Sequence, residues 1–230
     1  MKEFKIRCSA IGKIMTNPRG NKEGLSETTK SYCDMWLKEQ LYNRKYEFTS
    51  KYTDKGIIVE DNSIDFIAHM MGFGFLIKNE TFFEDEYMTG TPDLLPVGHD
   101  LVIDVKNSWS WETFPLLEEE LPNKDYYGQL QGYMNLTTRK RAKLLYILSD
   151  TPEHLIEREA RRWCYTNGYD ELDMDIYEKY MGEMTYPDVE DALKIKSFDV
   201  PRSDDYIAAI KDRVMECREY IAYKLKSLNI

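Results

Sequence analysis

The feature that most constrains the fold is a change of hydrophobic period near the middle of the chain. Residues 56–71 repeat apolar side chains at helical spacing, whereas residues 75–83 and 101–105 alternate apolar and polar side chains as half-buried strands do. Further patterns follow, helical at 122–136, 153–163 and 203–225 and strand-like at 143–148 and 195–198. Strands interspersed with helices predict an α/β (α+β) fold, in which a small mixed β-sheet is flanked by helices.

Two helices are expected before this region. Ser9 precedes the run Ala-Ile-Gly-Lys-Ile-Met and predicts a short capped helix, which would end at the turn Asn-Pro-Arg-Gly of residues 17–20. Ser26 predicts the cap of a second helix, because Tyr32 and Trp36 then follow at helical spacing.

The size and composition predict one domain that spans residues 1–230. The chain has 230 residues, of which 42% are hydrophobic, and this is enough for one substantial core. We expect neither a membrane segment nor a secretory signal, since no apolar run approaches about 18 residues. The four cysteines stand apart in the sequence, as reduced thiols do in a cytoplasmic protein. A metal ion is therefore expected on oxygen ligands.

The net charge of −10 is distributed unevenly. Residues 1–55 carry 12 Lys and Arg against 7 Asp and Glu, whereas residues 56–133 carry 3 against 15. The acidic middle third is either solvated surface or the carboxylates of a cation site with a basic segment beside it. The positions of the carboxylates decide between these interpretations.

The most informative residues are Asp93, which follows a proline, and the run Asp104-Val105-Lys106. Residues two apart lie on one face of a strand, so Asp104 and Lys106 are expected to project together, with Asp93 reaching the same end from the preceding turn. Carboxylates suit Mg²⁺, and the Val105 carbonyl is a further candidate ligand. Phosphodiester hydrolysis requires such an ion, together with a group like the Lys106 amine to orient or deprotonate water.

Neighbouring helices add to this set. Glu60 lies on the apolar face of the helix predicted at 56–71, where a carboxylate is costly to bury without a cation. Gln129 and Tyr133 are four residues apart and should project from one face of the helix predicted at 122–136. An amide and a phenol suit the rim of a phosphate site, although helix packing against the sheet is the alternative role.

The chain resembles the PD-(D/E)XK nucleases, and among them the lambda-type (YqaJ-like) phage recombination exonucleases. The resemblance covers about residues 1–150. It rests on Ser-Ala-Ile-Gly-Lys-Ile at 9–14, Pro-Arg-Gly at 18–20, Gly56 with Glu60, Thr-Pro-Asp at 91–93, Asp-Val-Lys at 104–106, and Gln129 with Tyr133.

The resemblance implies a role for each matching residue. Asp93, Asp104 and the Val105 carbonyl would hold the metal, Glu60 would do so directly or through water, and Lys106 would activate the attacking water. Three further implications concern DNA: Ser9 and Thr91 would hold the 5′-phosphate, Arg19 would contact the duplex end, and Lys13 lies in the same motif. Lys2 stands where the family has a phosphate-binding arginine, so that contact is expected to weaken or to pass to Arg7.

The expected activity is that of a Mg²⁺-dependent exonuclease, with Mn²⁺ as the other candidate ion. Members of this family degrade one strand of linear double-stranded DNA from its 5′ end, release mononucleotides and leave 3′ single-stranded overhangs for recombination. The resemblance further implies a ring-shaped homotrimer and a single-strand annealing protein as partner. A phage or prophage would then encode the chain, which would act in the bacterial cytoplasm.

Two alternatives remain open. One is a structure-specific or end-processing endonuclease of the same fold; the iron–sulfur relatives among these are disfavoured, because Cys164 and Cys217 are 53 residues apart. The other is a non-catalytic module that binds DNA ends or protein, against which the complete set of acidic residues and Lys106 argues. Trp109 and Trp111, shortly after Lys106, have two interpretations: they stack on bases, or they pack a loop onto the core.

Overall fold

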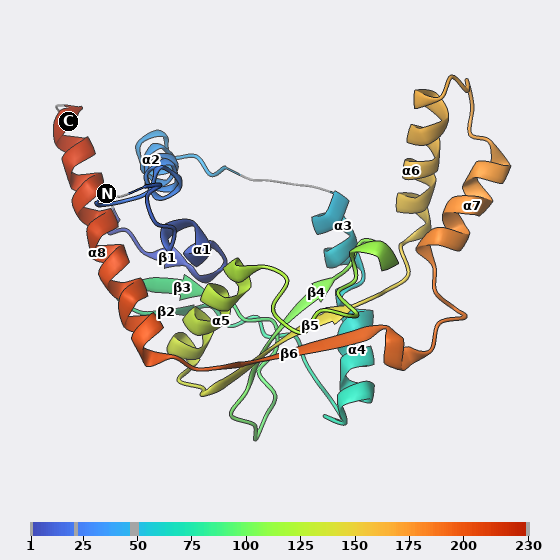
Figure 1. Ribbon diagram of the computed structural model, residues 1–230, viewed down its shortest axis with the longest axis horizontal. Coiled ribbons are helices and arrows are strands. Elements are labelled where there is room, and N and C mark those ends of the chain that lie inside the picture. The colour runs from blue at the N-terminus through green and yellow to red at the C-terminus, as the bar shows by residue number, and fades with distance from the viewer. Residues whose placement is uncertain (1, 21–22, 47–50, 229–230) are drawn as a thin grey trace.

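The computed structural model describes residues 2–20, 23–46 and 51–228, and of residues 51–53 the backbone alone. Helices and short strands alternate along these residues (Figure 1). The elements are β1 (Ile6–Arg7), the 3₁₀ turn η1 (Cys8–Ala10), α1 (Ile11–Ile14), α2 (Glu27–Tyr42), α3 (Lys51–Ile58), α4 (Glu60–Met71), β2 (Phe83–Glu84), β3 (Met88–Gly90), β4 (Val102–Asn107), η2 (Trp111–Thr113), α5 (Lys124–Thr137), β5 (Arg141–Ile147), α6 (Glu153–Thr166), α7 (Met174–Met184), η3 (Asp191–Leu193), β6 (Ile195–Pro201) and α8 (Asp204–Ser227).

The described strands form two mixed sheets of three strands each. In one sheet β3 lies between β1, which is parallel to it, and β2, which is antiparallel. In the other sheet β5 lies between β4, which is parallel to it, and β6, which is antiparallel. An isolated antiparallel bridge between Leu94 and Ile103 links the segment after β3 to β4. The predicted fold class is confirmed, with the mixed sheet divided into two.

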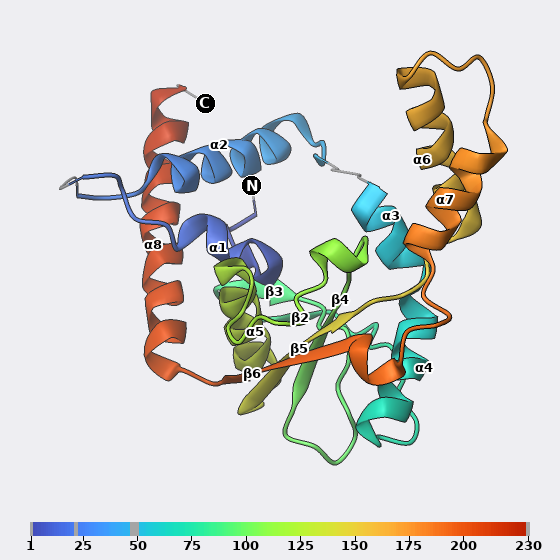
Figure 2. The ribbon, with the colours of Figure 1, turned by 45° about the vertical axis from the view of Figure 1, so that its right-hand side comes forward.

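Helices cover both faces of the β4–β5–β6 sheet. Ile103 and Leu145 belong to a core cluster with Ile64 and Ile67 of α4. The neighbouring residues of these strands, such as Val102 and Leu144, join the cluster that includes α5. Successive side chains of a strand point to opposite faces, so β4 presents one set of residues to α4 and the other to α5. Figures 1 and 2 show α4 and α5 on either side of these strands.

Two groups of helices extend beyond the sheets. On one side α8 packs against α1, α2 and α5, with Cys33 of α2 and Cys217 of α8 in the same core. On the other side α6 and α7 form a hairpin that projects from the second sheet (Figure 2). None of the described helices is both long enough and apolar enough to cross a membrane.

Several expected elements differ in detail at the N-terminal side. Ser26 caps α2 as predicted, since its Oγ accepts a hydrogen bond from the Thr29 backbone N–H at 3.0 Å. The expected cap at Ser9 is wrong: Ser9 lies inside the 3₁₀ turn η1, and α1 begins only at Ile11, with no side-chain cap at Ala10. This places Ser9 on an exposed turn directly after β1.

The middle of the chain also differs from the expected pattern. The helix predicted at 56–71 begins earlier, at Lys51, and is interrupted at Val59, which divides it into α3 and α4. The strand predicted at 75–83 is wrong for most of its length: only Phe83 belongs to a strand, and Lys78 forms a single bridge with Leu94. Its alternating apolar residues, including Phe75, are exposed because no strand pairs with them to form a sheet surface. The pattern did not predict α7.

Candidate active site

Strand β4 carries the central residues. Its alternation directs Ile103 to the α4 side and Asp104 and Lys106 to the α5 side. The Asp104 side chain is 1% exposed, and its Oδ2 lies 2.6 Å from the Lys106 Nζ. The predicted juxtaposition of Asp104 and Lys106 is therefore present in the structure.

The Leu94–Ile103 bridge brings Asp93 to this pair. Both backbone hydrogen bonds of the bridge form, at 3.0 and 3.1 Å. In an antiparallel register the residues on either side of such a pair also face each other, so Asp93 lies opposite Asp104. The Asp93 Oδ2 accepts a hydrogen bond from the Val105 backbone N–H at 2.7 Å. Side chains directly opposite each other have Cβ atoms about 5 Å apart, so two carboxylates meet here across the bridge.

The charges of the two carboxylates and of Lys106 shift the pKa values of Asp93 and Lys106. Burial, and then the charge of Asp104, raise the pKa of Asp93 to about 7. Burial acts to lower the pKa of Lys106, but the negative charges of Asp104 and Asp93 outweigh it and raise that pKa. Lys106 is thus an ammonium ion at neutral pH while both carboxylates face it.

Helix α5 supplies a second layer of contacts on Asp104. The Gln129 amide nitrogen donates to the Asp104 Oδ1 at 2.9 Å, and the same nitrogen lies 3.0 Å from the Tyr133 hydroxyl oxygen. Both side chains are buried. Tyr126 lies on the same side of α5, with the Lys106 ammonium 5.1 Å from the centre of its ring. Gln129 and Tyr133 therefore lie beside the acidic pair, and Gln129 orients the Asp104 carboxylate.

The donor set fits a divalent cation bound through oxygen. The Asp104 Oδ2 is buried, and its partner among the described residues is the Lys106 ammonium. Two facing carboxylates are the kind of oxygen ligands that Mg²⁺ and Mn²⁺ prefer, and an ion here would share the Asp104 carboxylate with Lys106. A cation would also remove the repulsion that raises the pKa of Asp93.

Glu60 does not complete the expected set of three carboxylates. It begins α4, and its Oε2 forms an ion pair with the Lys78 Nζ at 2.5 Å. Its charge still contributes to the raised pKa of Asp93. Within the described residues, no three Asp, Glu, His or Cys side chains are grouped so as to hold a metal ion. The expectation that Glu60 converges with Asp93 and Asp104 on one ion stays a prediction, because Lys78 holds its carboxylate in this arrangement.

Ser9 and Thr91 lie at the ends of neighbouring strands. In the parallel pairing of β1 with β3, Arg7 is opposite Thr89; Ser9 follows in the 3₁₀ turn η1 and Thr91 directly follows β3. Both residues are exposed. Thr91 is two residues before Asp93 in the chain, and the role of the two hydroxyl groups at a phosphate stays a prediction.

The basic residues expected at DNA are all exposed. Lys13 forms a long ion pair with Asp125, at 3.8 Å. Arg7 interacts with the hydroxyl group of Tyr32. Figure 2 shows the loop between α1 and α2, which carries Arg19, projecting past α8 and away from β4. For Lys2 and Arg19, the described part of the chain shows no contact with the acidic pair.

Sequence reasoning missed two lysines. Lys78 holds Glu60 and also lies within electrostatic range of Asp93, and its bridge to Leu94 explains this position. Lys55 is 1% exposed, and its Nζ donates to the Trp109 carbonyl oxygen at 3.0 Å. Burial lowers the pKa of Lys55 to about 8. Neither lysine belongs to a recognised motif. A charged residue directly after the apolar run at 75–77, as Lys78 is, could have indicated a side chain with a specific partner.

A polar cluster fixes the end of β4 beside Lys55. The Asn107 Oδ1 accepts hydrogen bonds from the Ser63 Oγ at 2.7 Å and from the Ser149 Oγ at 2.9 Å. Ser63 belongs to α4 and Ser149 follows β5, so three elements meet at this strand end. The strand that carries Asp104 and Lys106 is thereby held at its carboxyl end.

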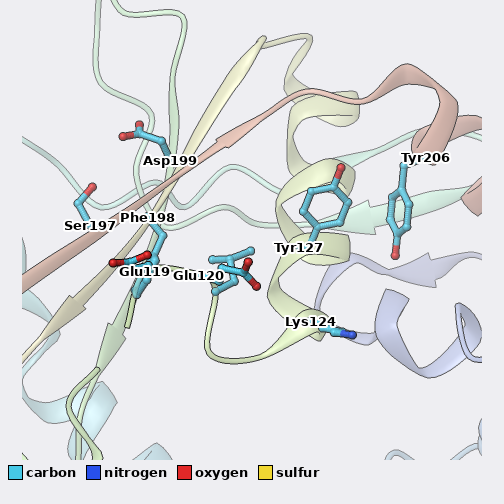
Figure 3. A pocket seen from close by; sticks show the side chains of 9 residues that line it. Glu119, Glu120, Lys124, Tyr127, Ser197, Phe198, Asp199 and Tyr206 are labelled. Atoms are coloured by element: carbon cyan, nitrogen blue, oxygen red, sulfur yellow. The ribbon is translucent and has the colours of Figure 1, made fainter. Parts of the chain in front are cut away.

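A wide hollow of about 770 Å³ lies elsewhere, between α5, β6 and the loop before α5 (Figure 3). Glu119, Glu120 and Asp199 line it, together with Lys124 and with Tyr127 and Tyr206, which meet edge to face with ring centres 4.9 Å apart. Its acidic lining disfavours a phosphate ligand, and neither Asp93 nor Asp104 lines it. The size of this hollow is therefore no guide to the chemistry.

The fold matches solved exonuclease structures. A phage-related exonuclease from Haemophilus somnus 129PT is 26% identical and superposes with a TM-score of 0.82, over 99% of this chain and 97% of that chain. An alkaline exonuclease from Laribacter hongkongensis is 16% identical, with a TM-score of 0.66 over 98% of this chain and 91% of its own. A complex of the latter enzyme with dAMP gives 15% identity and the same TM-score. No family model matches the chain, and no curated protein matches its sequence.

The comparisons agree with the resemblance inferred from the motifs. The similarity to the Haemophilus protein covers nearly all of both chains, including the part after residue 150, where no motif was recognised. The chain thus has the fold of the phage-related and alkaline exonucleases.

Proposed function

We propose that this protein is a divalent-metal-dependent nuclease that hydrolyses phosphodiester bonds in DNA. The observation that carries this proposal is the pair of facing carboxylates, the half-buried Asp93 and the buried Asp104, with the Lys106 ammonium 2.6 Å from Asp104. The fold match to exonucleases supports the same reaction class.

Each residue has a distinct role in this proposal. Asp93, Asp104 and the Val105 carbonyl hold the ion, which is Mg²⁺ or Mn²⁺, and Glu60 contributes through water or by leaving Lys78. When bound, the ion would neutralise the negative charge that develops on the phosphate. Lys106 orients the attacking water as an ammonium ion, and it can accept the proton of that water only after it has released its own proton to solvent. Because two carboxylates raise the pKa of Lys106, this step requires their charge to be compensated first.

Gln129 and Tyr133 support the carboxylates in this scheme. The hydrogen bond from Gln129 to the Asp104 Oδ1 fixes this carboxylate, and its Oδ2, which now faces Lys106, would bind the ion. Tyr133 lies next to Gln129 and restricts the rotation of its amide group. Such fixed contacts reduce the reorganisation needed during the reaction.

The finer proposal is a 5′-to-3′ exonuclease on linear double-stranded DNA, which releases mononucleotides and leaves 3′ overhangs. It is supported by the exposed hydroxyl groups of Ser9 and Thr91, which follow the neighbouring strands β1 and β3 and would suit a terminal 5′-phosphate. Arg7, Lys13, Lys2 and Arg19 would contact the duplex outside the site. The excess of basic residues in 1–55 suits contacts with DNA phosphates.

The biological setting proposed is phage-type recombination in the bacterial cytoplasm. A ring-shaped homotrimer would enclose the duplex and keep a chain of net charge −10 on DNA, since enclosure raises the effective concentration of the bound partner. A single-strand annealing protein would receive the 3′ overhang. The phage-related and alkaline exonucleases of matching fold support this setting.

One assay separates the candidate functions. End-labelled linear duplex and closed circular duplex are incubated with the purified protein, with Mg²⁺ or with chelator. Metal-dependent digestion of linear DNA alone is the expected result, with label at the 5′ end released first. Cutting of both substrates indicates an endonuclease, and digestion of neither indicates a non-catalytic module.

A further inference from the structure

The segment that follows β4 presents an exposed indole beside the candidate site. Trp111 is 59% exposed, whereas Trp109, two residues earlier, is half-buried. Tryptophan side chains are enriched at interfaces, where one face of the ring can bury a large area against a partner.

Three contacts hold this segment in place. The Trp111 backbone N–H donates to the Tyr186 hydroxyl at 3.1 Å. The Lys55 ammonium donates to the Trp109 carbonyl oxygen at 3.0 Å. The Ser110 backbone N–H donates to the Thr113 Oγ1 at 3.2 Å. Figures 1 and 2 both show this green segment next to α3, which carries Lys55. Trp111 is therefore an exposed ring on a segment that is fixed from both sides.

Trp111 borders a hollow of about 430 Å³. Its apolar lining includes Phe114, Leu148 and Tyr186, and Thr185, Glu183 and Asp188 supply polar groups. This volume lies within the range of about 300–1,000 Å³ that is usual for small-molecule sites. The carboxylates disfavour a phosphate inside the hollow and suit the amino groups of a nucleobase.

A chain of aromatic contacts links the wall of the hollow to the acidic site. The Lys106 ammonium lies 5.1 Å from the Tyr126 ring centre, and Tyr126 meets Tyr146 edge to face at 6.3 Å. Tyr146 packs against the cluster of Phe114, Leu148 and Tyr186. Tyr146 is also the strand partner of Lys106, and Leu148 follows it by two residues, which is about 7 Å along the chain direction at ~3.3 Å per residue.

We propose that this hollow binds an unpaired nucleobase of the DNA held at Asp93 and Asp104, and that Trp111 stacks on that base. The inference rests on the proposed function, because it assigns a second contact to the same substrate. The Lys196 ammonium, 3.1 Å from the Leu116 carbonyl at the rim, is placed to meet the phosphate of the same nucleotide. An aromatic ring that stacks on one base tolerates all four bases, so this contact requires no particular DNA sequence.

The test compares Trp111→Ala with Trp111→Phe and with Tyr165→Ala, a control on α6 that is also 59% exposed. The probe is a short duplex with a fluorescent label and a single-stranded tail, bound in Ca²⁺ instead of Mg²⁺ so that cleavage is suppressed. A second probe has abasic residues in its tail. Removing one base stack weakens binding by about 5- to 100-fold, so this loss is expected for Trp111→Ala on the first probe alone. Trp111→Phe and Tyr165→Ala should stay within about threefold of the wild type.

Equal affinity of Trp111→Ala and wild type for the first probe overturns the inference, as does an equal loss on both probes. If Trp111→Ala does not fold, fluorescence provides the answer: an oligonucleotide should quench tryptophan emission in the wild type and much less in Trp111→Phe. Unchanged quenching in Trp111→Phe contradicts the proposal. The two proposals fail separately, because a protein that does not cleave DNA can still show base-dependent binding through Trp111, and an active nuclease can lack it.

Discussion

The acidic centre and the basic rim of the candidate site are built in opposite ways. In the centre, Asp104 is buried, ion-paired with Lys106 and hydrogen-bonded by Gln129. On the rim, Ser9 and Thr91 are exposed, and Lys13 has a single long ion pair. This difference indicates that the fold holds the side chains proposed for the chemistry in fixed positions, whereas the side chains proposed to contact DNA are free to change conformation. Substitutions should therefore have steep effects in the centre and shallow ones on the rim.

The largest effect is expected at the centre. Asp104→Asn and Lys106→Ala should each reduce Mg²⁺-dependent digestion of linear duplex by at least about 10³-fold, since each removes a group that acts on the reacting phosphate or water. Initial rates with end-labelled DNA provide the measurement, and circular dichroism checks the fold. Lys179→Ala, on the exposed side of α7, is the control and should retain full activity. Rates above a tenth of wild type for either centre variant would remove the proposed site.

A smaller effect is expected one contact away from the ion. Gln129→Leu leaves the Asp104 Oδ1 without its hydrogen bond and should lower kcat by about 10- to 100-fold. Gln131→Leu is a matched control on the same helix: Gln131 is buried too, but it bonds the backbone of Pro201 and Ser203. It should lower Tm while kcat stays within about threefold. Equal kcat losses in the two variants would mean that Gln129 has only a packing role.

The rim should respond more weakly. The double variant Ser9→Ala with Thr91→Ala should reduce the preference for 5′-phosphorylated over 5′-hydroxyl ends by about tenfold, because two hydrogen bonds to a charged phosphate are lost. The ratio of kcat/KM on the two substrates is the measurement. Ser227→Ala, at the end of α8, should leave the ratio unchanged. A preference that survives in the double variant would assign the phosphate to other residues.

The smallest expected effect is a gain in stability when a residue of the centre is replaced. The pKa of Asp93 is about 7 when folded, against 3.8 ordinarily, so the folded state loses stability as pH rises from about 4 to about 7 and does not regain it above. Asp93→Asn removes this penalty. In chelator it should raise Tm by about 2–4 °C at pH 8 and by much less at pH 4, for a gain of about 1 kcal/mol.

Scanning calorimetry of wild type and Asp93→Asn at the two pH values measures this difference. The same variant should lose DNA cleavage, as expected where a functional group is kept at a cost in stability. An Asp93→Asn variant that is less stable than wild type at pH 8 would show that the carboxylate is already compensated inside the protein.

The chemical centre could be predicted from sequence because it depends on local geometry. The strand at 102–107 and the helix at 124–137 are strongly patterned, and their periods alone place Asp104 with Lys106 and Gln129 with Tyr133. The loop register that puts Asp93 opposite Asp104 depends on the Leu94–Ile103 bridge. Sequence placed Asp93 near the strand but not in that register.

The remaining features depend on long-range partners. Glu60 was expected at the centre, but Lys78, 18 residues away, holds it. The segment at 75–83 alternates like a strand and yet has one bridge, since strand formation needs a partner that the pattern does not reveal. Lys55 contacts a carbonyl oxygen 54 residues away, and no local rule predicts such a contact.

The most direct test of the account is calorimetric titration of the protein with Mn²⁺ or Mg²⁺, comparing wild type with the double variant Asp93→Asn, Asp104→Asn. The account predicts that the wild type binds the ion, with affinity falling as pH drops below about 7 because Asp93 must release its proton. The double variant should show no binding at the same concentrations. Equal binding by both proteins would contradict the claim that these two carboxylates hold the ion.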